Sequence, residues 1–473
     1  MLRSWSHHAA KIFGLTCARV VRPSLQPEFL YCPIATTATR VRCSHNAPPW
    51  RPASTLDEWV GKQARPISLR QLMVFGRSLT EDRLISSANY VRTELPTRLA
   101  HRIRDMQTLP YVVVTNPHIS QVYELYYKAF ESLRRIREIR TLDDNTRFCE
   151  GISQTLQEHL TVIPKLAMGI LECRDLMKPE DMDKFMNTIL RSRISRRVIA
   201  EQHLALSDTF NSSPSSSTPA ADFVGEVFLK CSAHEVVSQC FTAVQDLCIQ
   251  TYGISTPLPA LNLNGHLDAT FPYILSHLEY IIGELLRNSM QAMVERQKCR
   301  PRCWEGTLPP IEVTVCEAPQ HVIIRVSDQG GGIPRDILPH LWSFSKGPRS
   351  SQRLENLTQV PKMAATLQEV RVSSEVPSPL SSSSPMPQKH GVEDTDPLPS
   401  RSGHHNSLST LSSRPPDLRL GMGLPLSRIY AEYWAGNLEV HSLEGYGTDA
   451  FLQISKLGNK NEQLTKRASI DAV

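Results

Sequence analysis

The sequence predicts an α + α/β protein, in which a bundle of long helices precedes a mixed α/β domain. Residues 55–207 contain few glycines, and their apolar residues recur at intervals of three and four, as on one face of an α-helix. From about residue 222 the segments are shorter, and residues 311–316 and 321–328 alternate apolar and polar side chains as half-buried strands do. A chain of 473 residues has room for two or three such domains.

The first 50 residues have the composition of a targeting segment. They contain six basic residues and a single acidic one, Glu28, among Ser, Thr, Ala and Cys. This pattern is typical of an organelle transit peptide, whereas a secretory signal needs an unbroken apolar core. A disordered tail is the alternative. We expect residues 1–50 to be a mitochondrial transit peptide and the protein to reside in the mitochondrial matrix.

Composition argues against several classes of protein. No run of 18 apolar residues occurs, so we expect no transmembrane segment. The net charge of +5 is modest for this length and gives no case for nucleic acid as a partner. The eleven cysteines are scattered, and the close pair Cys299 and Cys303 has no second Cys or His pair at zinc-finger spacing. We expect reduced cysteines and no metal held by thiolates.

The helical region, residues 55–207, predicts a bundle of amphipathic helices joined by short breaks. Prolines mark these breaks. Residues 208–221 include "NSSPSSSTPAA" and predict a flexible linker or insertion. The prolines that mark the breaks between the predicted helices are Pro96, Pro110, Pro117, Pro164 and Pro179.

The second domain is expected at residues 222–457. Its strand at 321–328 runs into Asp328 and three glycines, and "LGMGLPLSRIYAEYWAG" predicts a helix followed by a second hairpin. Residues 347–417 are crowded with Ser, Pro, Arg and Gln, which predicts a disordered insertion that ATP binding and folding do not need. Residues 458–473 form a C-terminal tail.

One predicted helix carries polar residues along a single face. Glu284, Asn288, Gln291 and Glu295 lie three or four apart and share a stripe, while Ser289 faces the opposite, apolar side. Such a stripe is most often simply solvated. The alternative is a phosphoryl-transfer site, in which Asn288 offers a neutral oxygen to magnesium and Glu284 orients or deprotonates a nucleophile.

The remaining motifs suit a nucleotide. Asp328 at a strand end can accept a hydrogen bond from an exocyclic amine, and Gly330–Gly332 allow a close approach of the backbone. Gly421 and Gly423, at the start of a helix, offer backbone N–H groups and the positive end of the helix dipole to phosphates. Each signal is weak alone, and their order along the chain makes them specific.

That order, E-x-x-x-N, D-x-G-G-G, G-x-G-L and G-x-G-T, resembles the α/β-sandwich ATPase domain of the gyrase, Hsp90, histidine kinase and MutL type. The helical segments "RTELPTRLAHRI", "EHLTVIPKLAMGILE" and "LRSRISRRVIAEQH" narrow the match. Together they resemble the mitochondrial 2-oxoacid dehydrogenase kinase family, which comprises pyruvate dehydrogenase kinase and branched-chain 2-oxoacid dehydrogenase kinase. The resemblance covers roughly residues 65–207, 222–346 and 418–456.

The resemblance implies roles for individual residues. Asn288 would bind magnesium, and Glu284 would be the base or orienting carboxylate toward a substrate serine. Asp328 would recognise adenine with Thr448 beneath the ring, although an ordinary strand threonine is the alternative reading of Thr448. The glycine motifs that would shape the pocket and its lid contribute Gly330, Gly332, Gly421, Met422, Gly423 and Leu424.

The implied function is that of a protein serine kinase with ATP and Mg²⁺ as cofactors. It would phosphorylate and inactivate the E1 alpha subunit of the pyruvate dehydrogenase complex, bind lipoyl domains of the E2 core and form a homodimer.

Some residues depart from the family pattern and leave alternatives open. Tyr280 stands where pyruvate dehydrogenase kinases commonly carry a histidine, which favours the branched-chain kinase, whereas "SLEGYGTDAF" is closer to the pyruvate enzyme. The tail lacks the Asp-Trp pair of the pyruvate kinases. Gln291 replaces a usual arginine, so a non-catalytic nucleotide-binding regulator is a further alternative. An ATPase of the Hsp90 or MutL kind is disfavoured by the preceding bundle.

Overall fold

The computed structural model describes residues 53–76, 79–212, 223–299, 308–347, 350–358 and 419–456, together with residues 462 and 464. The predicted transit peptide at 1–50 lies outside these residues, as do most of the predicted linker, insertion and C-terminal tail. The described residues all fall in one compact unit, Pro52–Val473. Within them, no helix has both the length and the apolar character that crossing a membrane requires.

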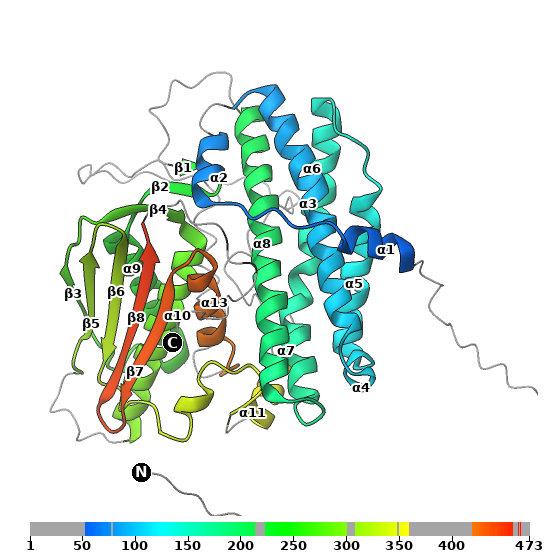
Figure 1. Cartoon of the computed structure of the whole chain (residues 1–473). Coiled ribbons are helices and arrows are strands. Elements are labelled where there is room, and N and C mark those ends of the chain that lie inside the picture. The colour runs from blue at the N-terminus through cyan, green and yellow to red at the C-terminus, as the bar shows by residue number, and fades with distance from the viewer. Residues whose placement is uncertain are drawn as a thin grey trace, which may run out of the picture. The chain divides into compact units, whose positions relative to one another are not determined.

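The N-terminal part is a set of packed helices, as predicted (Figure 1). The long helix α3 packs against α5 and α8, and α5 packs against α7. Apolar residues such as Ile103 of α3 and Phe130 of α5 are completely buried between them. The helices are α1 (Ala53–Val60), α2 (Leu69–Gly76), α3 (Glu81–Gln107), α4 (Tyr111–Val114), α5 (Pro117–Arg134), α6 (Leu142–Glu158), the 3₁₀ turn η1 (His159–Thr161), α7 (Val162–Glu172) and α8 (Pro179–Ser212).

Most of the prolines mark helix starts, as predicted, but one does not. Pro110 precedes α4, Pro117 and Pro179 are first residues of helices, and Pro164 lies in the first turn of α7. At these positions the missing N–H has no partner to lose. Pro96 was expected to mark a break and instead lies inside α3. It is buried in the bundle, and the packing of α3 on both sides outweighs the lost helical hydrogen bond.

Helix α8 continues five residues past the predicted end of the bundle. The sequence placed a linker from residue 208, whereas the helix reaches Ser212. The physical reason is apolar packing, because Leu206 is buried and Phe210 packs against the same small cluster, which also contains Leu84. The remainder of the predicted linker is outside the described residues.

The second part contains two sheets with helices, as predicted. The strand order is β1-β2-β4 in one sheet and β3-β5-β6-β8-β7 in the other. Helices α10 and α13 lie between the larger sheet and α8 (Figure 1). The elements are β1 (Phe223–Val224), β2 (Val227–Ser232), α9 (Ala233–Tyr252), β3 (Leu261–Gly265), β4 (Thr270–Ile274), α10 (Leu275–Cys299), β5 (Ile311–Glu317), β6 (His321–Asp328), the 3₁₀ turn η2 (Leu338–His340), α11 (Ser350–Thr358), α13 (Gly423–Tyr433), β7 (Asn437–Leu443) and β8 (Gly447–Ser455).

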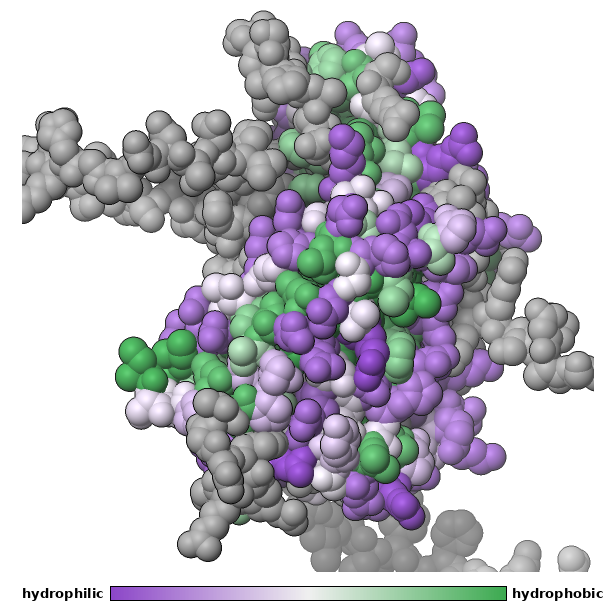
Figure 2. Space-filling view, turned by 90° about the vertical axis from the view of Figure 1, so that its left-hand side faces the viewer, coloured by the Kyte–Doolittle hydropathy of each residue, from purple (hydrophilic) through white to green (hydrophobic). Residues whose placement is uncertain are grey.

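Both predicted hairpins are present in the larger sheet. β5 pairs with β6 and β7 pairs with β8, each antiparallel. β6 also pairs with β8, which sets Asp328 directly opposite Thr448. Alternate residues of β6 are buried, so the sheet turns one face to the helices. Seen from the side of the α/β domain, hydrophobic residues form small groups among hydrophilic ones (Figure 2).

Helix α10 is enclosed along most of its length. It packs against α9, α13 and β6, and even Glu284, Arg287 and Gln291 are buried. The polar stripe predicted on this helix is therefore not simply solvated. A helix that buries its polar residues must give them partners, because an unpaired buried polar group is costly.

Helix α11 occupies the start of the segment that the sequence predicts to be a disordered insertion. Residues 350–358 are helical. Leu357 is buried and Leu354 packs against the core, so apolar packing stabilises this otherwise polar helix. Asn356 Nδ2 also donates a hydrogen bond to the carbonyl oxygen of Arg419, at 2.8 Å. The rest of the predicted insertion, from residue 359 to 417, is outside the described residues.

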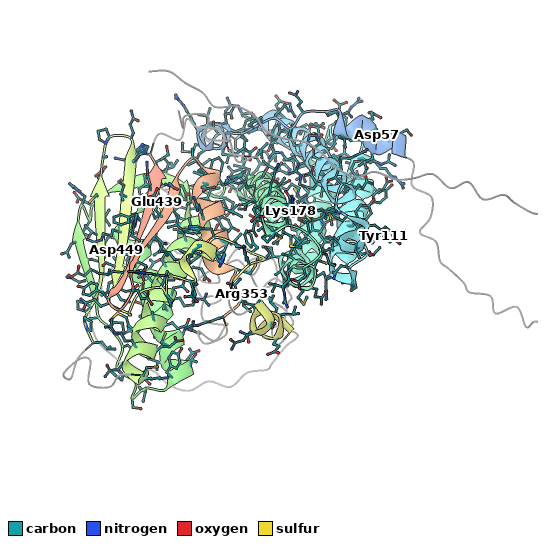
Figure 3. All side chains as sticks on the ribbon, turned by 60° about the horizontal axis from the view of Figure 1, so that its bottom comes forward. Asp57, Tyr111, Lys178, Arg353, Glu439 and Asp449 are labelled. Carbon is teal, nitrogen blue, oxygen red and sulfur yellow. The ribbon has the colours of Figure 1, made fainter. Side chains whose placement is uncertain are left out.

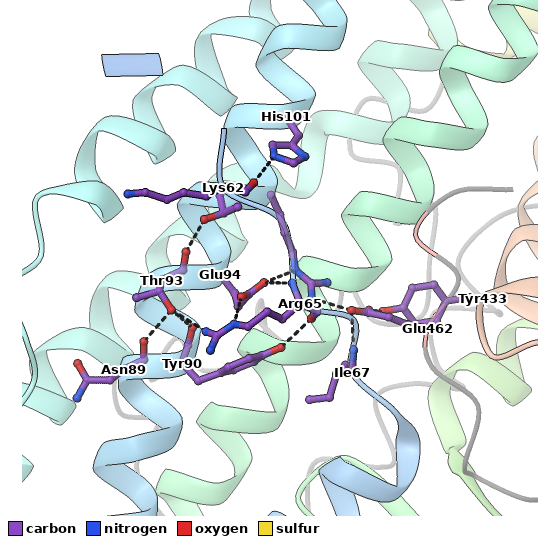
Figure 4. A network of polar contacts seen from close by, with 12 residues as sticks. Lys62, Arg65, Ile67, Asn89, Tyr90, Thr93, Glu94, His101, Tyr433 and Glu462 are labelled. Atoms are coloured by element: carbon purple, nitrogen blue, oxygen red, sulfur yellow. Dashed lines mark hydrogen bonds and ion pairs between the residues drawn. The ribbon is translucent and has the colours of Figure 1, made fainter. Parts of the chain in front are cut away.

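A buried carboxylate of the C-terminal tail joins the bundle to the α/β domain (Figure 4). Glu462 Oε1 accepts hydrogen bonds from Arg98 Nη2 at 2.7 Å and from the backbone N–H of Ile67 at 3.2 Å. Its other oxygen accepts from the Tyr433 hydroxyl at the end of α13. Glu94 contacts the same arginine from the other side, with Arg98 Nε donating to Oε2 at 3.3 Å. Burial lowers the pKa of Arg98, but Glu462, Tyr433 and Tyr90 together more than offset this effect, so the pKa is raised and the guanidinium is charged.

Removing the Glu462 carboxylate should therefore destabilise the protein. In Glu462→Ala, Arg98 and Tyr433 lose a buried acceptor, and we expect the free energy of unfolding to fall by about 2–4 kcal/mol. Urea titration followed by circular dichroism measures it. Glu439→Ala is the matched control, because Glu439 pairs with His441 on the exposed surface and such pairs contribute little. Equal urea midpoints for the two variants would show that the Glu462 contacts do not stabilise the protein.

Candidate functional site

A cavity of about 590 Å³ opens between α10, the ends of β6 and β8, α11 and the start of α13. Its volume is in the range of small-molecule and cofactor sites. It gathers side chains and glycines from positions more than 150 residues apart in the sequence. Of the residues predicted from the sequence, those that line it are Glu284, Asn288, Asp328, Gly330, Gly332, Gly421, Gly423, Leu424 and Thr448.

Met422 is the predicted residue that does not line the cavity. Its side chain is buried and belongs to the hydrophobic core, while its flanking residues Gly421 and Gly423 face the cavity. Met422 is also the residue that precedes the first turn of α13, and its carbonyl oxygen accepts a hydrogen bond from the Leu426 N–H at 3.0 Å. The geometry gives Met422 a packing contact beneath the cavity.

Asp328 forms the inner end of the cavity. Its Oδ1 accepts the N–H of Gly330 at 2.8 Å and its Oδ2 accepts the hydroxyl of Ser289 at 3.0 Å. Burial raises the pKa of Asp328, while hydrogen bonds from Gly330, Ser289 and the backbone of Thr448 hold it down. The result is an oriented hydrogen-bond acceptor in a largely buried position. A ligand amine is the group that this arrangement can bind.

Ser289 is a site residue that sequence reasoning missed. The helical period put it on the apolar side of α10, away from Asn288. In the structure β6 ends beside α10, so the hydroxyl of Ser289 reaches Asp328. The sequence contains one indication of this role, since Ser289 is a small hydroxyl residue on an otherwise apolar helical face.

Glu284 is held by a neighbour on its own helix. Arg287 Nη2 donates to Glu284 Oε2 at 2.5 Å, and both residues are buried. Burial raises the pKa of Glu284 and the Arg287 guanidinium opposes that rise. The carboxylate is thus oriented toward the cavity and is more basic than an exposed glutamate. Arg287 was also missed, although its spacing of three residues from Glu284 permits such a pair.

The second glycine motif fits closely against this carboxylate. A Cβ atom at Gly423 would lie 2.1 Å from Glu284 Oε2, so any side chain there would displace the carboxylate. Gly332 has φ +73°, and a Cβ atom there would lie 2.3 Å from the Leu443 carbonyl oxygen. The packing of the cavity walls therefore requires glycine at both positions, whether or not a ligand is bound.

Asn288 and Gln291 line the cavity along α10, as Glu284 does. Asn288 lines the cavity one turn after Glu284. Gln291 Nε2 donates to Glu295 Oε1 at 2.9 Å, and Glu295 pairs with Arg419. Among the described residues no group of three or more His, Cys, Asp or Glu side chains could hold a metal. A magnesium ion here would need few protein ligands, which suits the single neutral oxygen of Asn288 together with ligand phosphates and water.

Arg296 fixes the loops at the end of the sheet. Its Nη1 donates to the carbonyl oxygens of Gln329 at 2.6 Å and Tyr446 at 2.7 Å, and its Nη2 donates to that of Gly445 at 3.0 Å. Through these bonds the first glycine motif and the β7–β8 turn are held together beside the cavity. Sequence reasoning did not identify Arg296, because its partners are backbone atoms from distant segments.

Comparison with known proteins gives matches to both parts of the chain. Residues 66–228 match the family described as "Mitochondrial branched-chain alpha-ketoacid dehydrogenase kinase", and residues 274–377 match "Histidine kinase-, DNA gyrase B-, and HSP90-like ATPase".

Individual relatives match along most of the chain. Mitochondrial pyruvate dehydrogenase (acetyl-transferring) kinase 2 of Saccharomyces cerevisiae is 34% identical over 438 residues, which cover 88% of this chain and 86% of the relative. The mitochondrial pyruvate dehydrogenase (acetyl-transferring) kinase of Arabidopsis thaliana is 30% identical over 86% of this chain and 94% of its own length. Isozyme 4 of Mus musculus is 27% identical over 84% and 82%. The chain therefore belongs to the mitochondrial 2-oxoacid dehydrogenase kinase family, with an ATPase domain of the histidine kinase, gyrase and Hsp90 type.

Proposed function

We propose that this protein is a mitochondrial protein serine kinase that uses ATP to phosphorylate, and thereby inactivate, the E1 alpha subunit of the pyruvate dehydrogenase complex. The observation that carries the proposal is the meeting of Glu284, Asn288 and Asp328 in one cavity of nucleotide size. The names of relatives that match most of the chain support pyruvate dehydrogenase as the substrate.

Three elements would hold ATP in this cavity. Asp328 accepts a hydrogen bond from the adenine amine, with Thr448 on the neighbouring strand beneath the ring. Gly330 and Gly332 let the backbone approach the nucleotide. At the other end, the N-terminus of α13 at Gly421 and Gly423 offers N–H groups and the positive end of a helix dipole to the phosphates.

Phosphoryl transfer would take place beside Glu284. The substrate serine hydroxyl attacks the γ-phosphorus in line with the bond to ADP, the new O–P bond forms as the old one breaks, and the serine proton passes to Glu284 or is oriented by it. Arg287 keeps the carboxylate in place. Asn288 is the ligand for magnesium, which would neutralise charge on the transferring phosphates. Positioning and charge neutralisation supply most of the catalysis.

Two alternatives each have an observation in their favour. Branched-chain dehydrogenase as substrate is favoured by the family matched at residues 66–228 and by Tyr280, which contacts Tyr430 in an aromatic cluster next to α13. A non-catalytic nucleotide-binding regulator is favoured by Gln291, which leaves no positive charge at that point of α10.

The proposed partners have candidate surfaces. A mostly apolar groove of about 1200 Å³ lies between α2, α3 and the segment before α2, and Ile67, Leu72, Phe75 and Tyr90 line it. Its apolar walls suit the long hydrocarbon arm of a lipoyl group on an E2 domain.

The candidate surface for the homodimer is β7. It is the edge strand of the larger sheet and carries the exposed Leu443 at its end.

The substrate proposal is tested by offering purified pyruvate and branched-chain dehydrogenase complexes side by side. We expect label from γ-³²P-ATP on the E1 alpha subunit of the pyruvate complex, with loss of dehydrogenase activity in proportion to the label. Label on the branched-chain complex would select the first alternative. ATP binding with label on neither complex would select the non-catalytic regulator.

The proposed catalytic carboxylate is tested by Glu284→Gln. The amide keeps the shape but cannot accept the proton, so we expect transfer to fall by about 100-fold or more with ATP affinity changed little. Transfer of ³²P and calorimetric ATP titration measure the two effects. Glu439→Gln, which alters a carboxylate outside the cavity, should change neither. Equal losses of binding and transfer would assign Glu284 to nucleotide binding instead.

The magnesium proposal is tested by Asn288→Ala. Loss of the amide oxygen should weaken ATP binding in the presence of Mg²⁺ by about tenfold or more, with little effect when EDTA replaces the metal. Calorimetric titration under both conditions measures the difference. An unchanged magnesium dependence would remove Asn288 from the metal site.

The matrix proposal rests on the Arg-rich, acid-poor composition of residues 1–50 and on the mitochondrial names of the relatives. Fusion of residues 1–50 to a fluorescent protein should direct the reporter to mitochondria, and protease protection in isolated mitoplasts should place it in the matrix. The same fusion with its six basic residues changed to Ser is the control. A cytosolic signal from the unaltered fusion would refute the targeting role.

A further inference from the structure

Four arginines line the described part of the cavity, and three of them are engaged by protein oxygens. Arg287 pairs with Glu284, Arg419 pairs with Glu295, and Arg296 binds backbone carbonyl oxygens. Arg287 also has a buried Nε without a partner, but its guanidinium pairs with Glu284. Arg353 of α11 differs, because no carboxylate of the described residues pairs with it and its Nη1 is buried without a hydrogen-bond partner among them. Burial lowers the pKa of Arg353. A partly buried guanidinium whose Nη1 is shielded from water has hydrogen-bonding capacity to offer an anion.

The side chain of Arg353 is placed by the packing of its helix and by two glycines. Figure 3 shows Arg353 extending from α11, and Arg353 lines the same cavity as Glu284 and Asn288. A Cβ atom at Gly421 would lie 2.4 Å from Arg353 Nε, and one at Gly347 would lie 3.1 Å from Nη2. Both glycines have positive φ, which favours glycine over other residues at these positions. Because neither residue has a side chain, there is room for the guanidinium beside them.

The guanidinium therefore lies at the end of the cavity where α13 begins, since Gly421 is two residues before the first residue of that helix, Gly423. This is the end to which the helix N-terminus already attracts negative charge. On α10, Arg287 also lies near Gly423, but its charge is paired with Glu284, and Gln291 is neutral and bonded to Glu295. Arginine suits phosphate, since its planar donors can bind two oxygens at once.

We propose that Arg353 binds the terminal phosphates of the nucleotide, and that the long insertion thereby contributes a binding residue to the site. The inference rests on the proposed function, because it takes ATP as the occupant of the cavity. It differs from the prediction that the insertion is dispensable for ATP binding, because it assigns α11 to the site.

The test compares ligands that share adenine and differ in phosphates. Adenosine, ADP and Mg·ATP are titrated calorimetrically into the full-length protein and into Arg353→Ala and Arg353→Met, the second of which keeps the length of the side chain. We expect both variants to bind ATP about 10- to 100-fold more weakly, as for loss of hydrogen bonds to a charged group, with adenosine affinity unchanged. Arg335→Ala is the matched control, since this arginine is 92% exposed and does not line the cavity.

Two outcomes would overturn the inference. If both variants retain the ATP affinity of the unaltered protein, Arg353 does not bind phosphate. If adenosine and ATP affinities fall together, Arg353 only supports the fold of the cavity, and lower thermal unfolding midpoints of the variants would accompany that result. Failure of the unaltered protein to bind any adenine ligand would instead refute the proposed function, and the inference with it.

Discussion

The burial of α10 on nearly all sides is the constraint on which the rest of the α/β domain depends. The helix packs against the sheet and against α9 and α13, so its polar residues cannot be left to solvent. Glu284 pairs with Arg287 and Gln291 with Glu295, both within the helix, whereas Ser289 bonds to Asp328 at the end of β6. The Ser289 bond holds the strand end beside α10, and Gly423 of the second glycine motif packs against the Glu284 carboxylate, so that both border the cavity.

The bundle and the α/β domain are joined by charged groups at several points along α3 and α8. Glu462 bonds to Arg98 of α3 and to Tyr433 of α13. Arg191 of α8 pairs with Glu432, also on α13, and Asp183 near the start of α8 accepts the N–H of Phe344 at 2.9 Å. The first two contacts reach the helix whose N-terminus borders the nucleotide cavity. Ile67, whose backbone N–H donates to Glu462, lines the apolar groove of the bundle. The buried Glu462 therefore contacts both a residue of the groove and Tyr433 of α13.

The predicted insertion between the two glycine motifs contains an ordered helix near its start, α11. Leu354 and Leu357 give its first helix an apolar anchor, and Asn356 ties that helix to the segment before Gly421. A segment that is rich in Ser and Pro overall can therefore contain a short ordered helix. Compositional rules average over a window and do not detect two leucines spaced three apart with a partner surface elsewhere in the chain.

The sequence by itself determined the order of the two parts, both hairpins of the larger sheet and nine residues of the cavity lining. Helical and strand periods are local properties, and the glycine motifs need the same residue types wherever they occur. Tertiary structure decided the rest. Whether the face of α10 that carries Glu284 meets water or a cavity depends on what packs against it, and the partners of that face come from strands and helices far along the chain. Ser289, Arg296 and Arg353 entered the site in this way, because contacts of a side chain across the fold are set by packing and are at most weakly marked in the local pattern of residues. Arg287 differs, since its partner Glu284 lies three residues away on the same helix.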